Sequence, residues 1–256
     1  MAVAAFFDLD RTVTAGASTL WFGKAALAHG YYPRSQLARD AWKAFWFRMK
    51  GDAGQDTGGL RDHILSAVKG WRRSDMDVLI PEVLAPILER VYPQSWERIL
   101  EHERAGVRTY LCSASPVEIV GAVARALQMS GGAIATVAAV DGDGRYTGEL
   151  EGPFCYAEGK AEALRAEAAR SKIDLSRSWA YSDSSSDVPM LDAVGHAVAV
   201  NPDSELRKIA EERGWEIERF EPRHGLRVVI ASTSVVGVGA IATGVALGVR
   251  AIRRRP

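Results

Sequence analysis

The chain has 256 residues, no formal net charge, 47% hydrophobic residues and 25% charged residues, which is an ordinary globular composition. This excludes disordered and collagen-like architectures and allows one large domain or two small ones. Two cysteines cannot form a disulfide framework, so a reducing compartment is expected. Residues 218–256 contain seven arginines and two acids, a net charge of +5. Because the whole chain is neutral, residues 1–217 carry a net charge of −5, which does not indicate a nucleic-acid partner.

Short apolar runs alternate with amphipathic helical patterns along most of the chain. Strands are expected at residues 3–9, 107–112, 178–181 and 197–200, with an edge strand at 215–220. Helices are expected at residues 116–129, 159–169, 188–193 and 204–213. This alternation predicts an α/β fold in which helices cover both faces of a parallel sheet. Because ligands bind at the carboxyl ends of such strands, the residues that follow each strand are the first candidates for chemistry.

Two segments interrupt this alternation. Residues 16–92 show helical patterns and no clear strand, which predicts an inserted helical lobe. Residues 136–150 hold two extended arms around a Gly-Asp-Gly turn, which predicts a small β-hairpin. One helix of the lobe places four large apolar side chains on a single face, namely Trp42, Phe45, Trp46 and Met49. This face is interpreted as the core of the lobe, and the alternative is a surface for lipid or for an apolar substrate tail.

Acidic residues follow two of the expected strands in pairs. Asp8 and Asp10 end the first strand, and because residues i and i+2 of a strand share a face, both can reach the same edge of the sheet. Asp183 and Asp187 follow the strand at 178–181. Four carboxylates in one crevice repel one another unless protons or a cation neutralise them. Oxygen ligands without His or Cys favour a hard ion such as Mg²⁺.

A hydroxyl group and an ammonium group are expected at the same edge. Ser113 follows the second strand, beside the start of the next helix, where anions bind readily, and Lys160 stands near the start of another helix. A metal ion, a hydroxyl, an ammonium and carboxylates together suit phosphoryl transfer. Asp8 can attack phosphorus and form an aspartyl-phosphate, while Asp10 protonates the leaving alcohol and then activates water.

These residues resemble the four ordered motifs of the haloacid dehalogenase superfamily. The run Asp8-Leu9-Asp10-Arg11-Thr12 matches its DxDxT motif, and the second, third and fourth motifs are matched by Ser113, Lys160 and the pair Asp183 and Asp187. The stretches CYAEGKAEAL and AYSDSSSDVPML are similar to the phosphoserine phosphatase-like branch. The resemblance covers residues 3–220.

The resemblance implies a Rossmann-like three-layer core at residues 1–15 and 93–226, with a helical cap inserted at residues 16–92. It implies a Mg²⁺-dependent phosphomonoester hydrolase in which Asp8 is the nucleophile and Asp10 the general acid and base. Asp8, Asp183 and the backbone carbonyl of Asp10 would bind the metal. Thr12, Ser113, Lys160 and Ser184 would form the phosphate-binding part of the site. Ser113 and Lys160 would hold the phosphate, Thr12 would support the loop and the acid, and Ser184 would contact the same network. Asp187 would orient Lys160 or a metal-bound water.

The chain departs from the phosphoserine phosphatase pattern near its first motif. Enzymes of that branch usually carry a glutamate shortly after DxDxT that recognises the substrate ammonium, and residues 13–18 hold no acid. Arg11 also stands where a serine is common. Phosphoserine is therefore the default substrate of the branch, and a membrane-proximal lipid phosphate of the lysophosphatidate or glycerophosphate type is the alternative. A non-catalytic, membrane-tethered phosphate sensor and a phosphoryl-transferring mutase share the same motifs.

Residues 228–249 form an uncharged run of 22 residues, long enough as a helix to cross a bilayer core. Arginines flank the run on both sides, and Ala240, Gly244 and Gly248 form a stripe of small residues. The hypothesis is an apolar C-terminal helix that attaches the protein to a membrane lipid surface, with the catalytic body in the cytoplasm. The alternative is a helix that packs on the core of a cytoplasmic protein. The sequence leaves the oligomeric state open.

Overall fold

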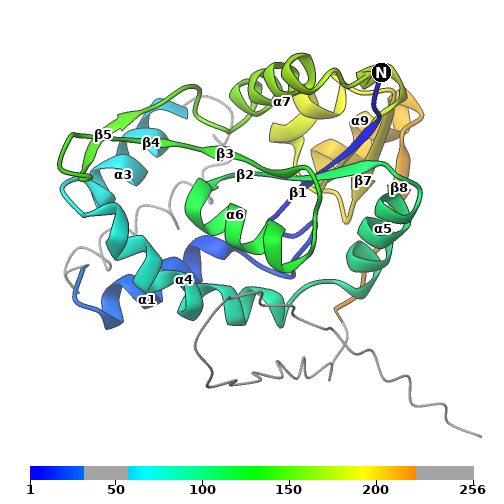
Figure 1. Cartoon of the computed structure of the whole chain (residues 1–256). Helices are drawn as coiled ribbons and strands as arrows, with labels where there is room; N and C mark the ends of the chain where they lie inside the picture. Colours follow the sequence, from blue (N-terminus) through cyan, green and yellow to red (C-terminus); the bar gives the residue numbers. More distant parts are fainter. Residues whose placement is uncertain (32–56, 223–256) are drawn as a thin grey trace, which may run out of the picture.

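The computed structural model describes residues 1–31 and 57–222. Within them, six parallel strands form one sheet in the order β3-β2-β1-β6-β7-β8 (Figure 1). The strands, in chain order, are β1 Ala4–Asp8, β2 Arg108–Pro116, β3 Gly132–Thr136, β6 Trp179–Ser182, β7 His196–Val200 and β8 Glu216–Glu218. Because β1 lies inside the sheet, its carboxyl end opens between the ends of β2 and β6.

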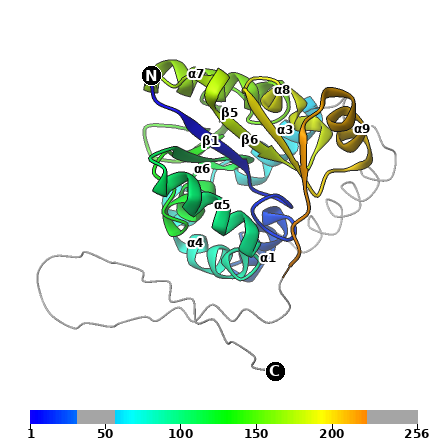
Figure 2. The ribbon, with the colours of Figure 1, turned by 90° about the vertical axis from the view of Figure 1, so that its right-hand side faces the viewer.

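Helices cover both faces of this sheet (Figures 1 and 2). They are α5 Pro93–Arg104, α6 Val117–Ala126, α7 Glu158–Ser171, α8 Val188–Leu191 and α9 Ser204–Arg213. Alternate residues of β1 point to opposite faces, so Phe7 packs in one hydrophobic cluster with α5 and α6, and Phe6 packs in another with α7, α8 and α9. Burial on both faces explains why β1 is apolar along almost its whole length.

Three further helices and a hairpin lie beside the sheet (Figure 1). They are α1 Ser18–Ala28, α3 Thr57–Val68, α4 Arg73–Leu88, and the antiparallel strands β4 Ala138–Val140 and β5 Tyr146–Leu150. Helix α1 packs on α4, and α3 packs on β5. Ala25, Leu79 and Val83 of α1 and α4 are buried in the same cluster as Phe7. The described part of the predicted helical lobe therefore shares its hydrophobic core with the sheet.

The α/β fold, the parallel sheet and the hairpin expected from the sequence are confirmed. Each expected strand is present within a few residues of its expected bounds, and β8 lies at the edge of the sheet. Two elements differ from the expectation. The hairpin arm expected from residue 136 begins at Ala138, and the residues before it form β3, which was not expected and joins the main sheet beside β2. Helix α5 was not expected; it is mostly polar and buries only Ser95 and Ile99.

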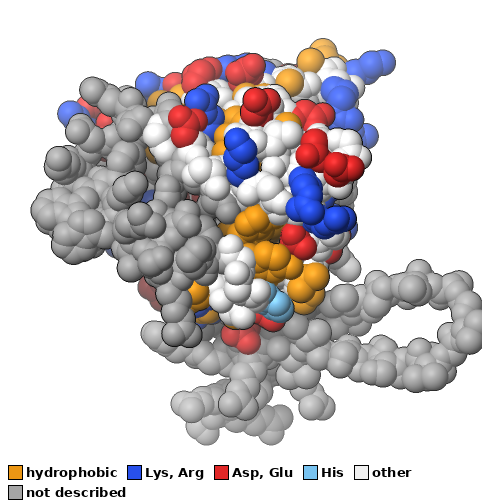
Figure 3. All heavy atoms as spheres, turned by 90° about the vertical axis from the view of Figure 1, so that its left-hand side faces the viewer, with side chains coloured by type: hydrophobic (Ala, Val, Ile, Leu, Met, Phe, Trp, Pro, Cys, Tyr) orange, Lys and Arg blue, Asp and Glu red, His pale blue; other side chains and the backbone are white. Residues whose placement is uncertain are grey.

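Two expected features lie outside the described residues: the apolar helix face at residues 42–49 and the apolar C-terminal helix at residues 228–249. Among the helices that the structure describes, none combines the length and the hydropathy that a bilayer crossing needs. Leu20, Val78 and Val140, on α1, α4 and β4, are large hydrophobic residues that stay exposed. Figure 3 shows apolar side chains among charged ones of both signs on the visible part of one side of the molecule.

Candidate active site

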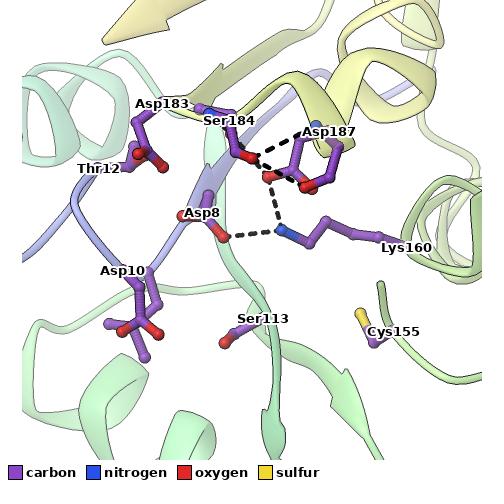
Figure 4. A network of polar contacts seen from close by, with 12 residues as sticks. Asp8, Asp10, Thr12, Ser113, Cys155, Lys160, Asp183, Ser184 and Asp187 are labelled. Carbon is purple, nitrogen blue, oxygen red and sulfur yellow. Dashed lines mark hydrogen bonds and ion pairs between the residues drawn. The ribbon is translucent and has the colours of Figure 1, made fainter. Parts of the chain in front are cut away.

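The carboxyl end of β1 carries the first pair of acids (Figure 4). Asp8 is the last residue of β1 and is 8% exposed, and Asp10 lies two residues further on, in the turn. Arg11 in this turn has a φ of 63°, a left-handed conformation that costs a non-glycine residue about 1–2 kcal/mol. Such strain persists where surrounding contacts hold it, and it is common at functional sites.

Lys160 in the first turn of α7 joins two of the acids. Its Nζ donates hydrogen bonds to Oδ1 of Asp8 and to Oδ2 of Asp187, both at 2.7 Å (Figure 4). Oδ2 of Asp187 also accepts a hydrogen bond from the hydroxyl of Ser182 at 2.6 Å. The Lys160 side chain is 4% exposed, so these ion pairs are shielded from water. The ends of β1 and β6 are thereby tied to the start of α7.

Gly159 explains how α7 begins close enough for Lys160 to reach the acids. A Cβ atom at residue 159 would lie 2.0 Å from the carbonyl oxygen of Phe154, which real structures do not allow. Glycine at this position therefore lets the first turn of α7 approach the preceding loop backbone. A larger residue would push the turn, and Lys160 with it, away from Asp8.

Asp183 follows β6 and pairs with a cation from the first motif. Its Oδ2 lies 2.8 Å from Nε of Arg11, and the side chain of Asp183 is 5% exposed. The carbonyl of Asp183 accepts a hydrogen bond from the backbone N–H of Asp203, which fixes the loop against the start of α9. The two acidic motifs that the sequence placed on separate strands therefore meet at one edge of the sheet.

Thr12 lies beneath the turn of the first motif, where it contacts both Asp183 and α5. It is fully buried and is not among the residues that line the pocket. Its hydroxyl lies 3.5 Å from Oδ1 of Asp183, to which it donates, and its carbonyl accepts a hydrogen bond from Ser95 of α5. The chain turns back at Arg11, so Thr12 lies beneath the turn and is placed to support Asp183.

Asp10 connects the first motif to the start of α1. Its carboxylate accepts hydrogen bonds from the backbone N–H of Ser18 at 2.7 Å and from its hydroxyl at 3.2 Å. A negative group at a helix N-terminus is favourable, and Ala17 has no side chain that could cap the helix itself. The hydroxyl of Ser18 lies 3.0 Å from the hydroxyl of Ser115. The backbone N–H of Ser115 in turn donates a hydrogen bond to the hydroxyl of Ser113. These bonds join the first motif to the second.

The predicted site residues surround one pocket of about 400 Å³. All of them except Thr12 line it, namely Asp8, Asp10, Ser113, Lys160, Asp183, Ser184 and Asp187. The hydroxyl of Ser184 lies 2.9 Å from that of Ser186 and accepts a hydrogen bond from the N–H of Ser186, so it is positioned within its own loop.

Further polar residues to which the sequence gave no role also line the pocket, among them Arg11, Ser18, Ser115 and Glu118. The two serines stand at or just before the start of a helix, which is a local signal that could have marked them. Glu118 is an acid in the first turn of α6, which is also a local signal, but its partner is the hydroxyl of Tyr146 in the hairpin, 28 positions away.

The acids are crowded and shielded from water, which favours their protonated forms. Burial raises the pKa of Asp8 to about 8; Lys160 opposes this rise, and Asp187 and Asp183 add to it. Burial raises the pKa of Asp183 to about 7 against the effect of Arg11. Burial also raises the pKa of Asp10, and the hydrogen bonds from Ser18 oppose it. With every acid ionised, the four carboxylates would carry more negative charge than Arg11 and Lys160 neutralise.

The oxygen atoms of this site suit Mg²⁺. Raised pKa values on Asp8 and Asp183 indicate carboxylates that an added cation would stabilise in their ionised forms. Oδ1 of Asp187 is buried without a hydrogen-bond partner in the structure, so it is free to accept a hydrogen bond from a water molecule in the pocket. The described residues contain no cluster of three or more His, Cys, Asp or Glu side chains arranged for a metal. The predicted donor set fits this finding, because it needs two carboxylates and the carbonyl of Asp10.

We expect Mg²⁺ to stabilise the protein more at pH 8 than at pH 5. A carboxyl group with a higher pKa in the folded than in the unfolded state holds its proton longer in the folded state. The free energy of unfolding therefore falls as the pH rises from about 4, the unfolded pKa, and it stops falling above the folded pKa. For Asp183 and Asp8 this window ends at about 7 and about 8. Mg²⁺ binds the deprotonated groups and offsets the loss. Thermal melts with Mg²⁺ and with EDTA at matched ionic strength measure the difference, and equal shifts at both pH values would contradict it.

The fold and the acidic pocket together define a class of protein. A family model described as haloacid dehalogenase-like hydrolase matches residues 5–192. The chain belongs to this family, to its phosphoserine phosphatase-like branch, and it is a phosphatase of this superfamily.

Three similar proteins place the chain within the family. A probable phosphatase of Mycobacterium tuberculosis is 40% identical over 94% of this chain and 86% of its own length. Phosphoserine phosphatase SerB1 of the same species is 36% identical over 100% of this chain and 82% of its own length. Among solved structures, a protein of unknown function from Bordetella pertussis is 26% identical and has a TM-score of 0.75, over 85% of this chain and 98% of its own.

Proposed function

We propose that this chain is a Mg²⁺-dependent phosphomonoesterase that works through an aspartyl-phosphate on Asp8. The observation that carries the proposal is the contact between Asp8 and Lys160 in a pocket that Asp10, Ser113 and Asp183 also line. A carboxylate beside a fixed ammonium group can attack phosphorus while the ammonium neutralises a phosphate oxygen. Asp187 holds the ammonium in place from its other side.

The reaction has two steps, and both use Asp10. First, an oxygen of Asp8 forms a bond to phosphorus and the bond from phosphorus to the alcohol oxygen breaks, while Asp10 gives its proton to that oxygen. Then Asp10 takes a proton from a water molecule whose oxygen attacks phosphorus, the bond to Asp8 breaks, and inorganic phosphate leaves. The raised pKa of Asp10 favours the protonated form that the first step needs.

Other groups of the pocket hold the phosphate. The hydroxyl of Ser113 and the ammonium of Lys160 would donate hydrogen bonds to phosphate oxygens, and Ser184 would contribute a hydroxyl at the pocket edge. Mg²⁺ held by Asp8, Asp183 and the carbonyl of Asp10 would supply further positive charge to the phosphate oxygens.

We infer a division into a Rossmann-like three-layer core, residues 1–15 and 93–226, and a cap, residues 16–92. The arrangement of the pocket supports this division, because α1, α3 and α4 each contribute lining residues, as do the loops after β1 and β6. A cap in this place would exclude bulk water from the reacting phosphate and contact the leaving alcohol.

Two substrate classes have support. Similarity to a protein named phosphoserine phosphatase SerB1 supports phosphoserine. A membrane-proximal lipid phosphate is supported by apolar residues that line the pocket, including Phe22, Leu65 and Met76. The uncharged sequence of residues 228–249, which would form the membrane-attached helix, supports the same class. Attachment to a membrane and a cytoplasmic catalytic body remain predictions.

A panel of phosphate esters tests the proposed function. We expect the full-length protein to release phosphate from an aryl phosphate with Mg²⁺, and to lose this activity with EDTA. Phosphoserine, glycerol phosphate and lysophosphatidate in the same panel rank the substrate classes. No turnover of any ester would contradict the proposal and favour the membrane-tethered phosphate sensor. Transfer of the phosphoryl group to a second molecule, seen as a new phosphate ester that forms only when an acceptor is added, would instead favour the mutase.

A further inference from the structure

The polar and the apolar residues that line the pocket come from different elements. Asp8, Lys160 and Asp183, which we call the polar end, lie where strands and α7 meet (Figure 4). Helices α1, α3 and α4 and the hairpin contribute side chains that pack as one hydrophobic cluster and also line the pocket, namely Phe22, Val68, Met76, Ala138 and Tyr146. We call these five residues the apolar wall. Its side chains reach the pocket from elements outside the main sheet.

The charges of the pocket are distributed unequally between the polar end and the apolar wall. Among the described residues that line it, the cations are Arg11 and Lys160, and both are paired with acids of the polar end. Glu118 is the charged residue next to the apolar wall, where its Oε1 accepts a hydrogen bond from the hydroxyl of Tyr146 at 2.9 Å. Arg73 lies 3.6 Å from the same oxygen, but its side chain is 62% exposed and does not line the pocket.

We propose that the substrate is a phosphate monoester of an apolar alcohol that carries no carboxylate. This inference rests on the proposed function, because it takes the polar end as the phosphate site. The alcohol then lies against the apolar wall, where the described residues that line the pocket would present hydrocarbon and the Glu118 carboxylate to a substrate carboxylate, and no cation. A buried charge without a partner is strongly unfavourable, whereas each methylene group buried there is favourable. A volume of about 400 Å³ lies in the range of pockets that bind small organic molecules.

A chain-length series measures this preference directly. We expect kcat/KM of the full-length protein with Mg²⁺ to rise about fourfold per methylene from ethyl phosphate upward, until the alkyl chain fills the pocket. Phosphoserine should fall below butyl phosphate in the same assay. A flat or falling series, or phosphoserine above every alkyl phosphate, would overturn the inference. Lysophosphatidate in the same assay distinguishes a lipid from a soluble ester as the source of the apolar alcohol. A kcat/KM above that of octyl phosphate indicates a lipid, and a lower kcat/KM indicates a soluble ester.

Matched variants connect the preference to the residues that carry it. Val68→Thr places a hydroxyl in the apolar wall with little change of volume, and it should lower the ratio of octyl to ethyl phosphate kcat/KM about tenfold. Val78→Thr on α4 is the control, because Val78 is 51% exposed and does not line the pocket. Glu118→Gln keeps an acceptor for Tyr146 but removes the charge, so it should raise the ratio of phosphoserine to octyl phosphate kcat/KM. Unchanged ratios in both pocket variants would contradict the inference.

Failure of the inference can be told apart from failure of the proposed function. If an aryl phosphate is hydrolysed with Mg²⁺ while the alkyl series is flat, the phosphatase mechanism stands and the assignment of the alcohol is wrong. If no ester is hydrolysed, the proposed function itself is wrong.

Discussion

Asp8→Asn is expected to reduce phosphate release by at least ~10⁴-fold, because the amide cannot form the covalent bond to phosphorus on which the proposed mechanism depends. The amide retains the shape of the side chain and an oxygen that can accept the hydrogen bond from Lys160. A loss of this size would therefore report on the nucleophile and not on the binding of the ester.

The same substitution should leave the fold intact. Lys160 keeps its ion pair with Asp187 at 2.7 Å, so its buried charge is not left without a partner. Burial raises the pKa of Asp8, which means that the ionised carboxylate is already unfavourable there in the absence of a metal. We expect the free energy of unfolding to change by less than about 1 kcal/mol.

Thermal melts and phosphate release measured on the same preparation separate these two effects. Asp174→Asn is a control for the loss of a carboxylate, because Asp174 lies before β6 and does not line the pocket. This variant should retain its turnover. Asp8→Asn protein that is folded and still active would contradict covalent catalysis.

Asp10→Asn is expected to slow the reaction by ~10²–10⁴-fold, since it removes the group that protonates the leaving alcohol and activates the water. The amide oxygen of this variant can still accept the N–H of Ser18, so the start of α1 should keep its cap. The effect on the first step should depend on the leaving group, because an alkoxide needs the proton more than an acidic phenolate does.

Rapid-mixing kinetics can test both roles of Asp10. With an aryl phosphate whose phenol is acidic, Asp10→Asn should release one equivalent of phenol quickly and then turn over slowly, because hydrolysis of the aspartyl-phosphate still needs a base. With an alkyl phosphate, no burst of alcohol is expected. Equal slowing of alkyl and aryl esters without a burst would assign Asp10 a different role.

The centre of the sheet could be predicted from the sequence because β1, β2 and β6 are short, largely apolar runs that end in or are followed by acids or hydroxyls. Asp8 ends β1, Ser113 lies in the final part of β2, and Asp183 follows β6, so parallel alignment of these strands brings the three to one edge. Lys160 could be assigned through the resemblance to a known family. The strand β3 was missed, since its sequence of small residues lacks a clear period.

What the sequence by itself determined is the identity and order of the groups that can perform phosphoryl transfer, because motif spacing and strand ends are local properties of the chain. The tertiary structure alone decided that Thr12 is buried against Asp183, that Arg11 pairs with Asp183, and that an apolar wall next to Glu118 lines the same pocket as the acids. These features depend on contacts between distant segments, such as Thr12 with Asp183 across 171 positions. No local period or propensity records such contacts, because they exist only after the helices and the hairpin have packed beside the sheet.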